Sequence, residues 1–492
     1  MRPRTDRPIK SSDPRRETPR KVVVIGAGIT GLVAARELVK ACEKARRPVE
    51  VVVLEAAARI GGKVRTEMVD DAVVETGPDS FVTLKPDMLE LVRELGLEDQ
   101  LIPTGPDASV SVLKRGVLVP MPSGMRLITP TRLIPFALSP FFSIGAKLRM
   151  ALEPLIPARR GHDDESLADF TRRRLGSEAL DSLVAPMLAG IFAGDPEKMS
   201  VRSTFPQLLE MEKKGGLARS LWFGGPKAGP RREGFSTFMT IKGGLSRVIN
   251  ALAEALPPGA LRLDCPATAV RRHEGRWEVV TPRGVLQADA VIAAVPASAF
   301  ADSVEGLDPE LSNRLREIHF ASTATVTLIY DAATFPVKLK GFGFLTTRGE
   351  KTTLTAATYS SSKFPGRTPE GKIIIRAFVG GAGREEAAEA AVMRIESRVR
   401  EDLDRILGLK GVAPIAAKTT RWIKSNPQYN VGHARRLERL GSCLKGHPGL
   451  VLAGCSYGGV GLPDCVRSGR RAAELALPPH RGKHDAVHVG LA

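Results

Sequence analysis

A glycine-rich turn between an apolar strand and a helix constrains the fold of this chain more than any other feature. Residues 22–25 read Val-Val-Val-Ile, and GAGITG follows at 26–31 before a stretch whose apolar spacing predicts a helix. A second apolar run over 51–54 ends at Glu55. This order of strand, helix and strand has the length of a right-handed parallel unit, so the chain is predicted to open with an α/β domain.

The glycines of this turn indicate a bound dinucleotide. Gly26 permits the tight turn out of the strand, Gly28 lets the backbone approach a pyrophosphate, and Gly31 lets the helix pack closely on the sheet. The free N–H groups at the start of the helix then bind the phosphates. Glu55 can accept hydrogen bonds from ribose hydroxyls, and its charge disfavours the 2′-phosphate of NADP. FAD and NAD remain open at this point.

Two further glycine segments favour FAD. RIGGKVRT at 59–66 places Gly61 and Gly62 between cations, just beyond the ribose-binding strand, where it can follow the diphosphate and reach an isoalloxazine ring. Near the other end of the chain, a glycine-rich loop at 454–461 precedes a helix expected to start near Asp464, whose N-terminal dipole can face a reduced flavin. Both ends of the chain are therefore expected to hold one cofactor.

Composition limits the class of protein. With 492 residues and 43% apolar side chains, two or three globular domains are expected, and no apolar run reaches the roughly 18 residues of a membrane span. We expect a cytoplasmic protein. The five cysteines lack metal-ligand spacing, so reduced thiols and no metal site are expected.

The net charge of +18 raises the question of an anionic partner. Part of this charge lies in residues 1–21. The aromatic content of only 5% argues against a surface on which bases could stack, so nucleic acid is not an expected partner. A solvated basic surface, an acidic small substrate and an anionic membrane surface remain as explanations.

Several segments together resemble the porphyrinogen oxidases of haem biosynthesis, within the superfamily of amine oxidase and protoporphyrinogen oxidase flavoproteins. RIGG resembles the RxGG motif of that superfamily, and the porphyrinogen oxidase resemblance extends over residues 20–477. The matching segments are GPDSF at 77–81, PMPSG at 120–124, LAGIFAGD at 188–195, GGL at 243–245, TRW at 420–422, PQYNVGH at 427–433 and GVGLPDCV at 459–466.

The resemblance implies an α/β fold: a discontinuous Rossmann-type FAD-binding domain, a mixed-sheet substrate domain and an inserted helical domain. The predicted boundaries are a disordered basic tail over 1–19, the FAD-binding domain over 20–90, 240–300 and 421–477, the helical domain over 115–205, the substrate domain over 91–114, 206–239 and 301–420, and a disordered tail over 478–492. The apolar, proline-broken part of the helical domain suits either buried packing or a surface that touches the membrane or admits substrate.

The resemblance also implies the cofactor contacts. The cofactor-binding residues expected for FAD are Gly26, Gly28, Ile29, Thr30, Gly31, Glu55, Ala56, Arg59, Gly61, Gly62, Lys63, Gly77, Pro78, Asp79, Ser80, Ala267, Trp422, Gly454, Val460, Gly461 and Leu462.

The reaction implied is the six-electron oxidation of a porphyrinogen, with O2 as final acceptor and H2O2 as product. Such chemistry depends on position more than on a strong base, because aromatisation drives the later steps. By resemblance, the backbone carbonyl of Gly190 faces the macrocycle. The expected substrate contacts are Lys85, which pairs with a propionate, and the apolar residues Ile191, Phe192, Phe342, Phe344 and Leu345.

Coproporphyrinogen III, with four propionates, is the expected substrate, and Lys85 and PQYNVGH favour it. Protoporphyrinogen IX is the alternative, and an FAD amine oxidase or desaturase is a more distant one. An amine oxidase typically has an aromatic pair facing the flavin, whereas only Tyr457 of the four tyrosines lies in the C-terminal glycine loop. Expected partners are therefore a porphyrinogen and O2, with a peripheral membrane contact and a downstream ferrochelatase as further candidates.

Overall fold

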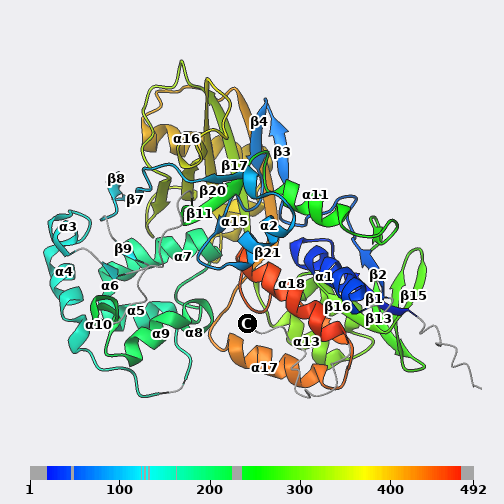
Figure 1. Cartoon of the computed structure of the whole chain (residues 1–492). Helices are drawn as coiled ribbons and strands as arrows, with labels where there is room; N and C mark the ends of the chain where they lie inside the picture. Colours follow the sequence, from blue (N-terminus) through cyan, green and yellow to red (C-terminus); the bar gives the residue numbers. More distant parts are fainter. Residues whose placement is uncertain are drawn as a thin grey trace, which may run out of the picture.

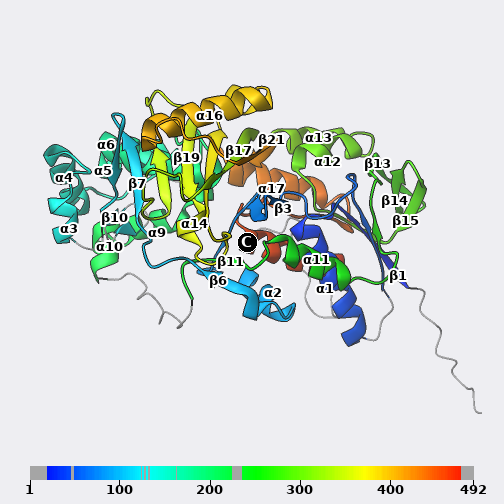
Figure 2. The ribbon, with the colours of Figure 1, turned by 90° about the horizontal axis from the view of Figure 1, so that it is seen from above.

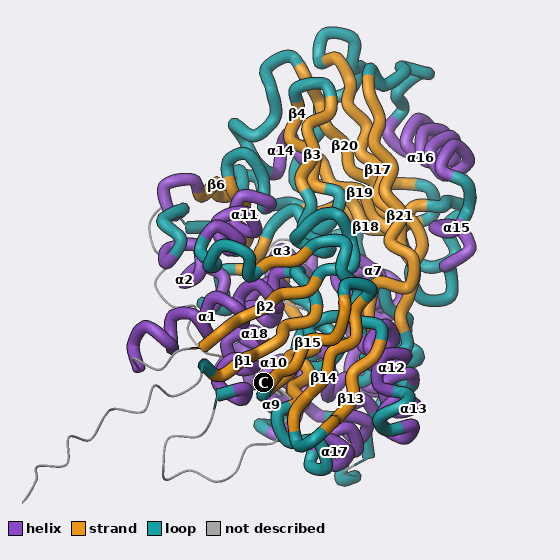
Figure 3. Tube along the Cα trace, turned by 90° about the vertical axis from the view of Figure 1, so that its right-hand side faces the viewer, coloured by secondary structure: helices purple, strands orange, loops and turns teal. Residues whose placement is uncertain are grey.

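The computed structural model describes residues 19–45, 49–122, 125–126, 129–130, 133–161, 163–223 and 235–477. Two large sheets dominate it: a parallel sheet and a mixed seven-stranded sheet, with a helical region at one end (Figures 1 and 3). Apart from Pro19, the two tails expected to be disordered lie outside the described residues, as do positions 123–124 of the PMPSG segment.

The parallel sheet assembles strands from distant parts of the sequence in the order β12-β2-β1-β16-β22. Its strands are β1 (Arg20–Ile25), β2 (Val49–Leu54), β12 (Leu261–Arg262), β16 (Ala290–Ala293) and β22 (Leu450–Leu452). Ile25 is in register with Leu54 on one side and with Ala293 on the other. The last four residues of β1 and of β2 are apolar and buried, as expected of a parallel sheet that is covered on both faces.

Different elements cover the two faces of this sheet. One face carries α1 (Ile29–Ala45), α11 (Ser246–Glu254) and α18 (Leu462–Ala476), and α1 lies along α18 (Figure 1). The other carries α12 (Ala297–Val304), α13 (Pro309–Arg316), α17 (His433–Leu444) and the antiparallel strands β13 (Ala269–His273), β14 (Arg276–Thr281) and β15 (Gly284–Ala288). The expected boundary at residue 300 thus falls inside α12.

The seven-stranded sheet has the order β21-β17-β20-β19-β18-β7-β8, and within it only β18 and β7 pair in parallel. Its strands are β7 (Val110–Lys114), β8 (Val117–Pro120), β17 (Phe320–Asp331), β18 (Gly343–Thr346), β19 (Leu354–Tyr359), β20 (Lys372–Gly380) and β21 (Ala416–Pro427). Residues 117–120, which the sequence placed in the helical region, therefore form an edge strand.

The large sheet is also covered on two faces. On one face of the sheet, residues of β17 such as Leu328 pack against α16 (Val392–Leu407) and form a cluster here called the large-sheet core. On the other face, Ile329 of β17 packs against the hairpin of β3 (Thr66–Val69) and β4 (Ala72–Glu75). The helix α15 (Glu385–Glu389) is separated from α16 by Ala390 and Ala391, whose ψ angles of 167° and 141° are extended. The short helix α14 (Ser360–Lys363) lies beside β20.

The helical region follows β8 and packs around a core of its own, here called the helical core, which includes Leu188 and Phe192. Its elements are β9 (Met125–Arg126), β10 (Thr129–Pro130), α3 (Leu133–Leu138), α4 (Ile144–Ala151), the 3₁₀ helix Glu153–Leu155, α5 (Leu167–Leu175), α6 (Ser177–Ala179), the π-helical turn Leu180–Val184, α7 (Ala185–Phe192), α8 (Val201–Thr204), α9 (Pro206–Lys213) and α10 (Leu217–Phe223). Arg174, fully buried, pairs with the buried Glu153 and so avoids an uncompensated charge.

A small antiparallel sheet lies between these bodies. It consists of β5 (Phe81–Val82), β6 (Leu101–Pro103) and β11 (Phe238–Ile241), and α2 (Asp87–Glu94) and the 3₁₀ helix Glu98–Gln100 lie near it in the chain. Seen from above, the helical region and the parallel sheet lie at opposite ends of the molecule (Figure 2). In the described part of the chain, no helix has both the length and the apolar character needed to cross a membrane.

Candidate active site

Three glycines shape the turn between β1 and α1, each for a different reason. Gly26 has φ +104°, and a Cβ on it would lie 2.8 Å from the carbonyl oxygen of Ala294. A Cβ on Gly31 would lie 1.9 Å from the carbonyl oxygen of Gly26. A Cβ on Gly28, in contrast, would meet no atom within 4 Å. The fold itself demands the first two glycines, whereas Gly28 faces open space beside the N-terminus of α1, where a diphosphate fits.

The RIGG segment lies directly against this turn. The N–H of Gly61 donates to Ala27 O at 2.8 Å, and Gly28 and Gly61 form a parallel bridge. Arg59 is turned back onto its own loop, since its Nη2 donates to Gly62 O at 2.9 Å. The structure thus brings both glycine motifs to the start of α1, whose first residues, Ile29 and Thr30, have N–H groups without helical partners.

Glu55 lies at the carboxyl end of β2, beside the same turn. Its Oε2 accepts from Ala27 N at 2.8 Å and its Oε1 accepts from Ala57 N at 3.0 Å. A carboxylate has about four acceptor sites, so both oxygens can still accept from ribose hydroxyls. The neighbouring Ala56 is exposed, and Ala267 is partly buried against the core on the other face of the parallel sheet.

The C-terminal glycine loop reaches the same place from the other end of the chain. Gly454 follows β22, and a Cβ on it would lie 3.8 Å from Thr30 Oγ1. Helix α18 begins at Leu462, two residues earlier than expected, and Asp464 Oδ2 accepts from Gly461 N at 3.3 Å. Val460 packs against the helical core. The two ends of the chain therefore meet here, as the glycine motifs predicted.

Lys63 connects the RIGG segment to this loop. Its Nζ donates to the carbonyl of Ser425 and lies 3.7 Å from Cys455 Sγ. A hydrogen bond from Cys465 and the charge of Lys63 outweigh burial and lower the pKa of the Cys455 thiol. Lys63 thus has two protein partners in addition to any phosphate.

The GPDS turn over 77–80 is held from several directions. A Cβ on Gly77 would lie 1.7 Å from Lys63 O, so only glycine fits there. The carbonyl of Thr76 accepts from Trp422 Nε1 at 2.8 Å and from Thr325 Oγ1 at 2.9 Å. Pro78 is partly exposed. These contacts fix the turn between the two large sheets.

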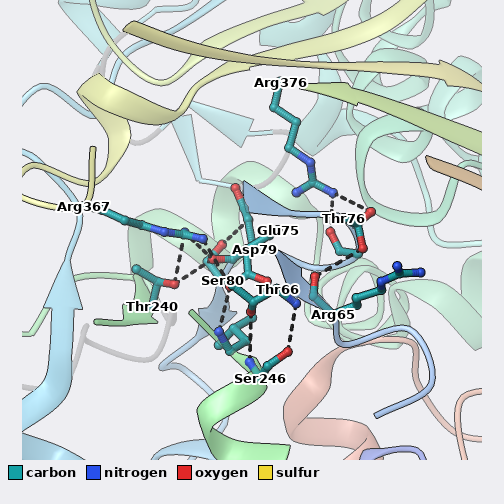
Figure 4. Close-up of polar contacts among 12 residues, drawn as sticks. Arg65, Thr66, Glu75, Thr76, Asp79, Ser80, Thr240, Ser246, Arg367 and Arg376 are labelled. Atoms are coloured by element: carbon teal, nitrogen blue, oxygen red, sulfur yellow. Dashed lines mark hydrogen bonds and ion pairs between the residues drawn. The ribbon is translucent and has the colours of Figure 1, made fainter. Parts of the chain in front are cut away.

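Buried charges surround the GPDS turn (Figure 4). Arg376, 3% exposed, donates to the carbonyl of Gly77, while Asp79 pairs with Lys363 at 3.0 Å and accepts from Ser80 Oγ at 2.7 Å. Burial opposes ionisation of Asp79, but Lys363 and Arg376 outweigh it and hold the pKa of Asp79 well below its usual value. Burial raises the pKa of Glu75, although Arg367 lies 3.1 Å away.

The expected substrate segment lies at the end of α7. A Cβ on Gly190 would lie 3.2 Å from Leu345 Cδ2, and Ile191 is 53% exposed. Phe192 packs in the helical core with its ring centroid 6.2 Å from that of Tyr429. As one of the last residues of α7, Gly190 has a carbonyl without a partner inside the helix. Gly190 and Leu345 are thus brought together at the end of α7, where Phe192 enters the helical core against which Val460 also packs.

Phe344 does not share a wall with Leu345. It is 1% exposed, lies in the large-sheet core and packs near Tyr359, with ring centroids 6.4 Å apart. Neighbouring residues of a strand point to opposite faces of the sheet, so Phe344 and Leu345 cannot both line one cavity. The expectation for Phe344 is therefore wrong. Phe342 precedes β18 and is partly buried.

Lys85 has a partner that the sequence did not suggest. Its Nζ lies 2.6 Å and 2.8 Å from the two carboxylate oxygens of Asp464. Asp464 also pairs with Arg467 at 2.6 Å. The carboxylate at the start of α18 thus pairs with two cations, and Lys85 remains 47% exposed.

Four residues of this region were overlooked in the sequence. Arg376 was detectable as a charge flanked by apolar residues within the strand KIIIRAFVG, and Asp464 as the acidic residue in the first turn of α18. Tyr429 and His433 lie in PQYNVGH, which carried a family resemblance but no assigned role. Their contacts depend on the tertiary structure.

Comparison with known proteins identifies the class. Residues 29–477 match the family of flavin containing amine oxidoreductases. The chain belongs to this family, and it is an FAD-dependent oxidoreductase. The open space at Gly28, the free acceptor sites of Glu55 and the two helix starts fit this cofactor.

Similarity over most of the chain narrows the class to the porphyrinogen oxidases. The chain is 36% identical over 465 residues to the coproporphyrinogen III oxidase of Bacillus subtilis (strain 168), covering 93% of this chain and 97% of that protein. It is 30% identical to the chloroplastic protoporphyrinogen oxidase of Nicotiana tabacum, covering 92% and 84%. A crystal structure from Exiguobacterium sp. 255-15, provisionally described as a protoporphyrinogen oxidase, superposes with a TM-score of 0.82 at 31% identity, covering 93% and 98%. The chain belongs with these proteins.

Proposed function

We propose that this protein oxidises coproporphyrinogen III to coproporphyrin III in a six-electron reaction, with O2 as the final electron acceptor and H2O2 as the product. The observation that carries the proposal is the full-length similarity to the Bacillus subtilis coproporphyrinogen III oxidase, which exceeds that to the tobacco protoporphyrinogen oxidase. FAD, when bound, supplies the two-electron acceptor for each round of oxidation.

The chain's own residues position the substrate against the cofactor. Leu345 lies against Gly190 at the end of α7, Val460 packs against the same helical core as Leu345, and Ile191 of α7 is exposed. Apolar side chains of this kind suit one face of an apolar macrocycle. The carbonyl of Gly190 is available as an acceptor for a polarised C–H or pyrrole N–H. Because oxidation ends in an aromatic ring, holding the reacting carbon against the cofactor contributes more than a strong base would. We include two further points in this proposal. The glycine motifs bind FAD through the residues named above, and the chain is divided into an FAD-binding domain, a substrate domain and a helical domain.

Charge complementarity favours the more acidic porphyrinogen. Coproporphyrinogen III carries four propionates, whereas protoporphyrinogen IX carries two, and the half-exposed Lys85 lies at the start of the segment that leads into α2. A propionate of the substrate can compete with Asp464 for the Lys85 ammonium. Protoporphyrinogen IX remains the second candidate because of the similarity to the tobacco enzyme.

The tyrosines argue against an amine oxidase. All four tyrosines of the chain, Tyr330, Tyr359, Tyr429 and Tyr457, are at most 4% exposed. A pair of tyrosine rings lining a substrate cavity is therefore not formed, whereas amine oxidation typically uses such an aromatic pair.

The test is a comparison of the two porphyrinogens under air. Purified holoenzyme is mixed with coproporphyrinogen III or protoporphyrinogen IX at matched concentration, and porphyrin fluorescence and H2O2 are followed. We expect faster turnover of coproporphyrinogen III and three H2O2 per porphyrin. Much faster turnover of protoporphyrinogen IX would overturn the substrate assignment, and product without O2 consumption would overturn the oxidase assignment.

We also propose a peripheral contact with an anionic membrane surface through α3, α4 and the following 3₁₀ helix. Large apolar side chains are exposed there, at the end of the molecule opposite the parallel sheet (Figures 1 and 2). They are Ile134, Leu138, Ile144, Leu148 and Leu155. Solvent-facing apolar patches of this kind mark interaction surfaces.

This contact is tested by sedimentation with vesicles containing phosphatidylglycerol. Wild type is expected to bind, whereas Ile144→Glu with Leu148→Glu is expected to stay in the supernatant, with unchanged turnover. Wild type that does not sediment would refute the contact. Transfer of the product to a ferrochelatase is a further part of the proposal, and channelling in a coupled assay would test it.

A further inference from the structure

The hydroxyl of Tyr429 joins two backbone positions of the C-terminal glycine loop. It donates to the carbonyl of Cys455 at 2.6 Å and accepts from the N–H of Gly459 at 2.8 Å. Gly459 has φ +130°, a conformation available essentially to glycine. The Tyr429 side chain, 1% exposed, therefore ties together the start and the middle of a loop whose conformation is unusual.

The ring of Tyr429 is itself held by His433. The two rings stack with centroids 4.3 Å apart and planes 15° from parallel. His433 Nε2 lies 3.2 Å from the carbonyl of Tyr457, so the neutral ring donates to it. Burial lowers the pKa of His433 to about 4, which keeps the ring neutral at neutral pH. Tyr429 and His433 together thus fix three backbone atoms of the loop 455–459.

The chain that carries Tyr429 is also bound to the expected substrate segment. Gln428 Nε2 donates to the carbonyl of Phe192 at 3.1 Å, and the N–H of Ser200 donates to the carbonyl of Tyr429 at 2.8 Å. Val431 N donates to Lys198 O at 2.8 Å. Residues 428–433, here called the connector, therefore touch the end of α7 on one side and the glycine loop on the other.

We propose that Tyr429 is a positioning residue for the oxidation, which holds the glycine loop in register with the FAD site and with the end of α7. The loop leads directly into α18, whose first turn is expected to face the cofactor. Loss of the hydroxyl leaves a partly buried carbonyl and a partly buried N–H without their partner, so the loop relaxes away from the conformation that binds the flavin. The proposal rests on FAD binding and is independent of which porphyrinogen is oxidised.

The test compares Tyr429→Phe with Tyr330→Phe. Tyr330 is equally buried, at 1% exposure, but lies in β17 within the large-sheet core, so its variant controls for the loss of a buried tyrosine hydroxyl. The readouts are the Kd of FAD from flavin fluorescence, the visible spectrum and midpoint potential of the bound flavin, and the Tm of the apoprotein. None of them requires a porphyrinogen, so failure of the substrate assignment would leave this test intact.

We expect Tyr429→Phe to raise the Kd of FAD about tenfold and to shift both the flavin spectrum and its potential, because two hydrogen bonds to the loop are lost. Tyr330→Phe should stay within twofold of wild type. A lowered Tm with unchanged Kd, spectrum and potential would show that Tyr429 only stabilises the fold, and would overturn the proposal. If Tyr429→Phe does not fold, His433→Asn decides by the same readouts, since it removes the support of the Tyr429 ring.

Discussion

Lys85 and Asp464 are 379 residues apart in sequence, and both carboxylate oxygens of Asp464 lie within 2.8 Å of the Lys85 ammonium. The pair connects the segment before α2 to the first turn of α18. It places a cation that is open to solvent next to the carboxylate that caps the glycine loop. A substrate propionate bound to Lys85, as proposed above, would therefore be coupled to the conformation of that loop.

Lys85→Gln is expected to raise the KM for coproporphyrinogen III about tenfold, because one charge-assisted contact with a propionate is lost. The Tm should change little, since Lys85 is 47% exposed and the buried Asp464 keeps Arg467 as its partner. Steady-state kinetics with Lys85→Arg, which keeps the charge, and with Lys213→Gln, at a distant exposed ion pair, provide the controls. An unchanged KM would remove Lys85 from the substrate site.

Gly28→Ala and Gly31→Ala are expected to fail in different ways. A Cβ on Gly28 meets no protein atom, so the apoprotein should fold with nearly the Tm of wild type, while FAD affinity falls by about tenfold or more because the methyl group occupies the diphosphate site. A Cβ on Gly31 would clash with the Gly26 carbonyl, and Gly31→Ala should lose about 3 kcal/mol of stability. Thermal unfolding of the apoproteins and FAD titration separate the two. Tight FAD binding by Gly28→Ala would contradict the placement of the FAD diphosphate beside Gly28.

Asp79→Asn is expected to lower the free energy of unfolding at pH 7 by about 3 kcal/mol, because Lys363 and Arg376 lose a buried counter-charge. The pKa of Asp79 is depressed in the folded state, so its contribution is present above the unfolded pKa of about 4 and is lost as the pH falls below that value. The difference between wild type and variant should therefore shrink below pH 4. Urea unfolding across this range measures it, with the exposed Asp99→Asn as control.

The lowered pKa of His433 predicts a second pH dependence of stability, and its sign follows from the direction of the shift. Its folded pKa of about 4 lies below the usual value of about 6.5, so the unfolded chain binds more protons between these values. The free energy of unfolding of the wild type should fall by about 2 to 3 kcal/mol as the pH falls from 6.5 to 4. His433→Asn should flatten this slope and His273→Asn, at an exposed position, should not. An equal slope in all three proteins would exclude the titration of His433.

The sequence was most informative where short-range geometry controls the structure. GAGITG and Glu55 predicted the strand, turn and helix because a tight turn, a close approach and a close helix packing each require glycine at fixed spacing. The RIGG segment and the C-terminal loop were correctly expected to reach the same place. Their spacing within each segment is local, and the family resemblance supported the inference that the two segments meet.

The sequence could not predict to which face of the large sheet a side chain points. Phe344 and Leu345 are adjacent apolar residues, and only the register of β18 between β7 and β19 decides that Leu345 faces α7 while Phe344 enters the large-sheet core. A shift of one residue would exchange them, since successive side chains of a strand alternate.

By itself, the sequence determined the class of this protein: a dinucleotide turn, a flavin-type second motif and a set of segments shared with porphyrinogen oxidases. The tertiary structure alone decided the long-range partnerships, such as Lys85 with Asp464, Arg376 with Gly77, and Tyr429 with Cys455 and Gly459. The physical reason is that glycine motifs encode local backbone conformation, whereas a buried charge or hydroxyl finds its partner only when the folded chain brings distant segments together.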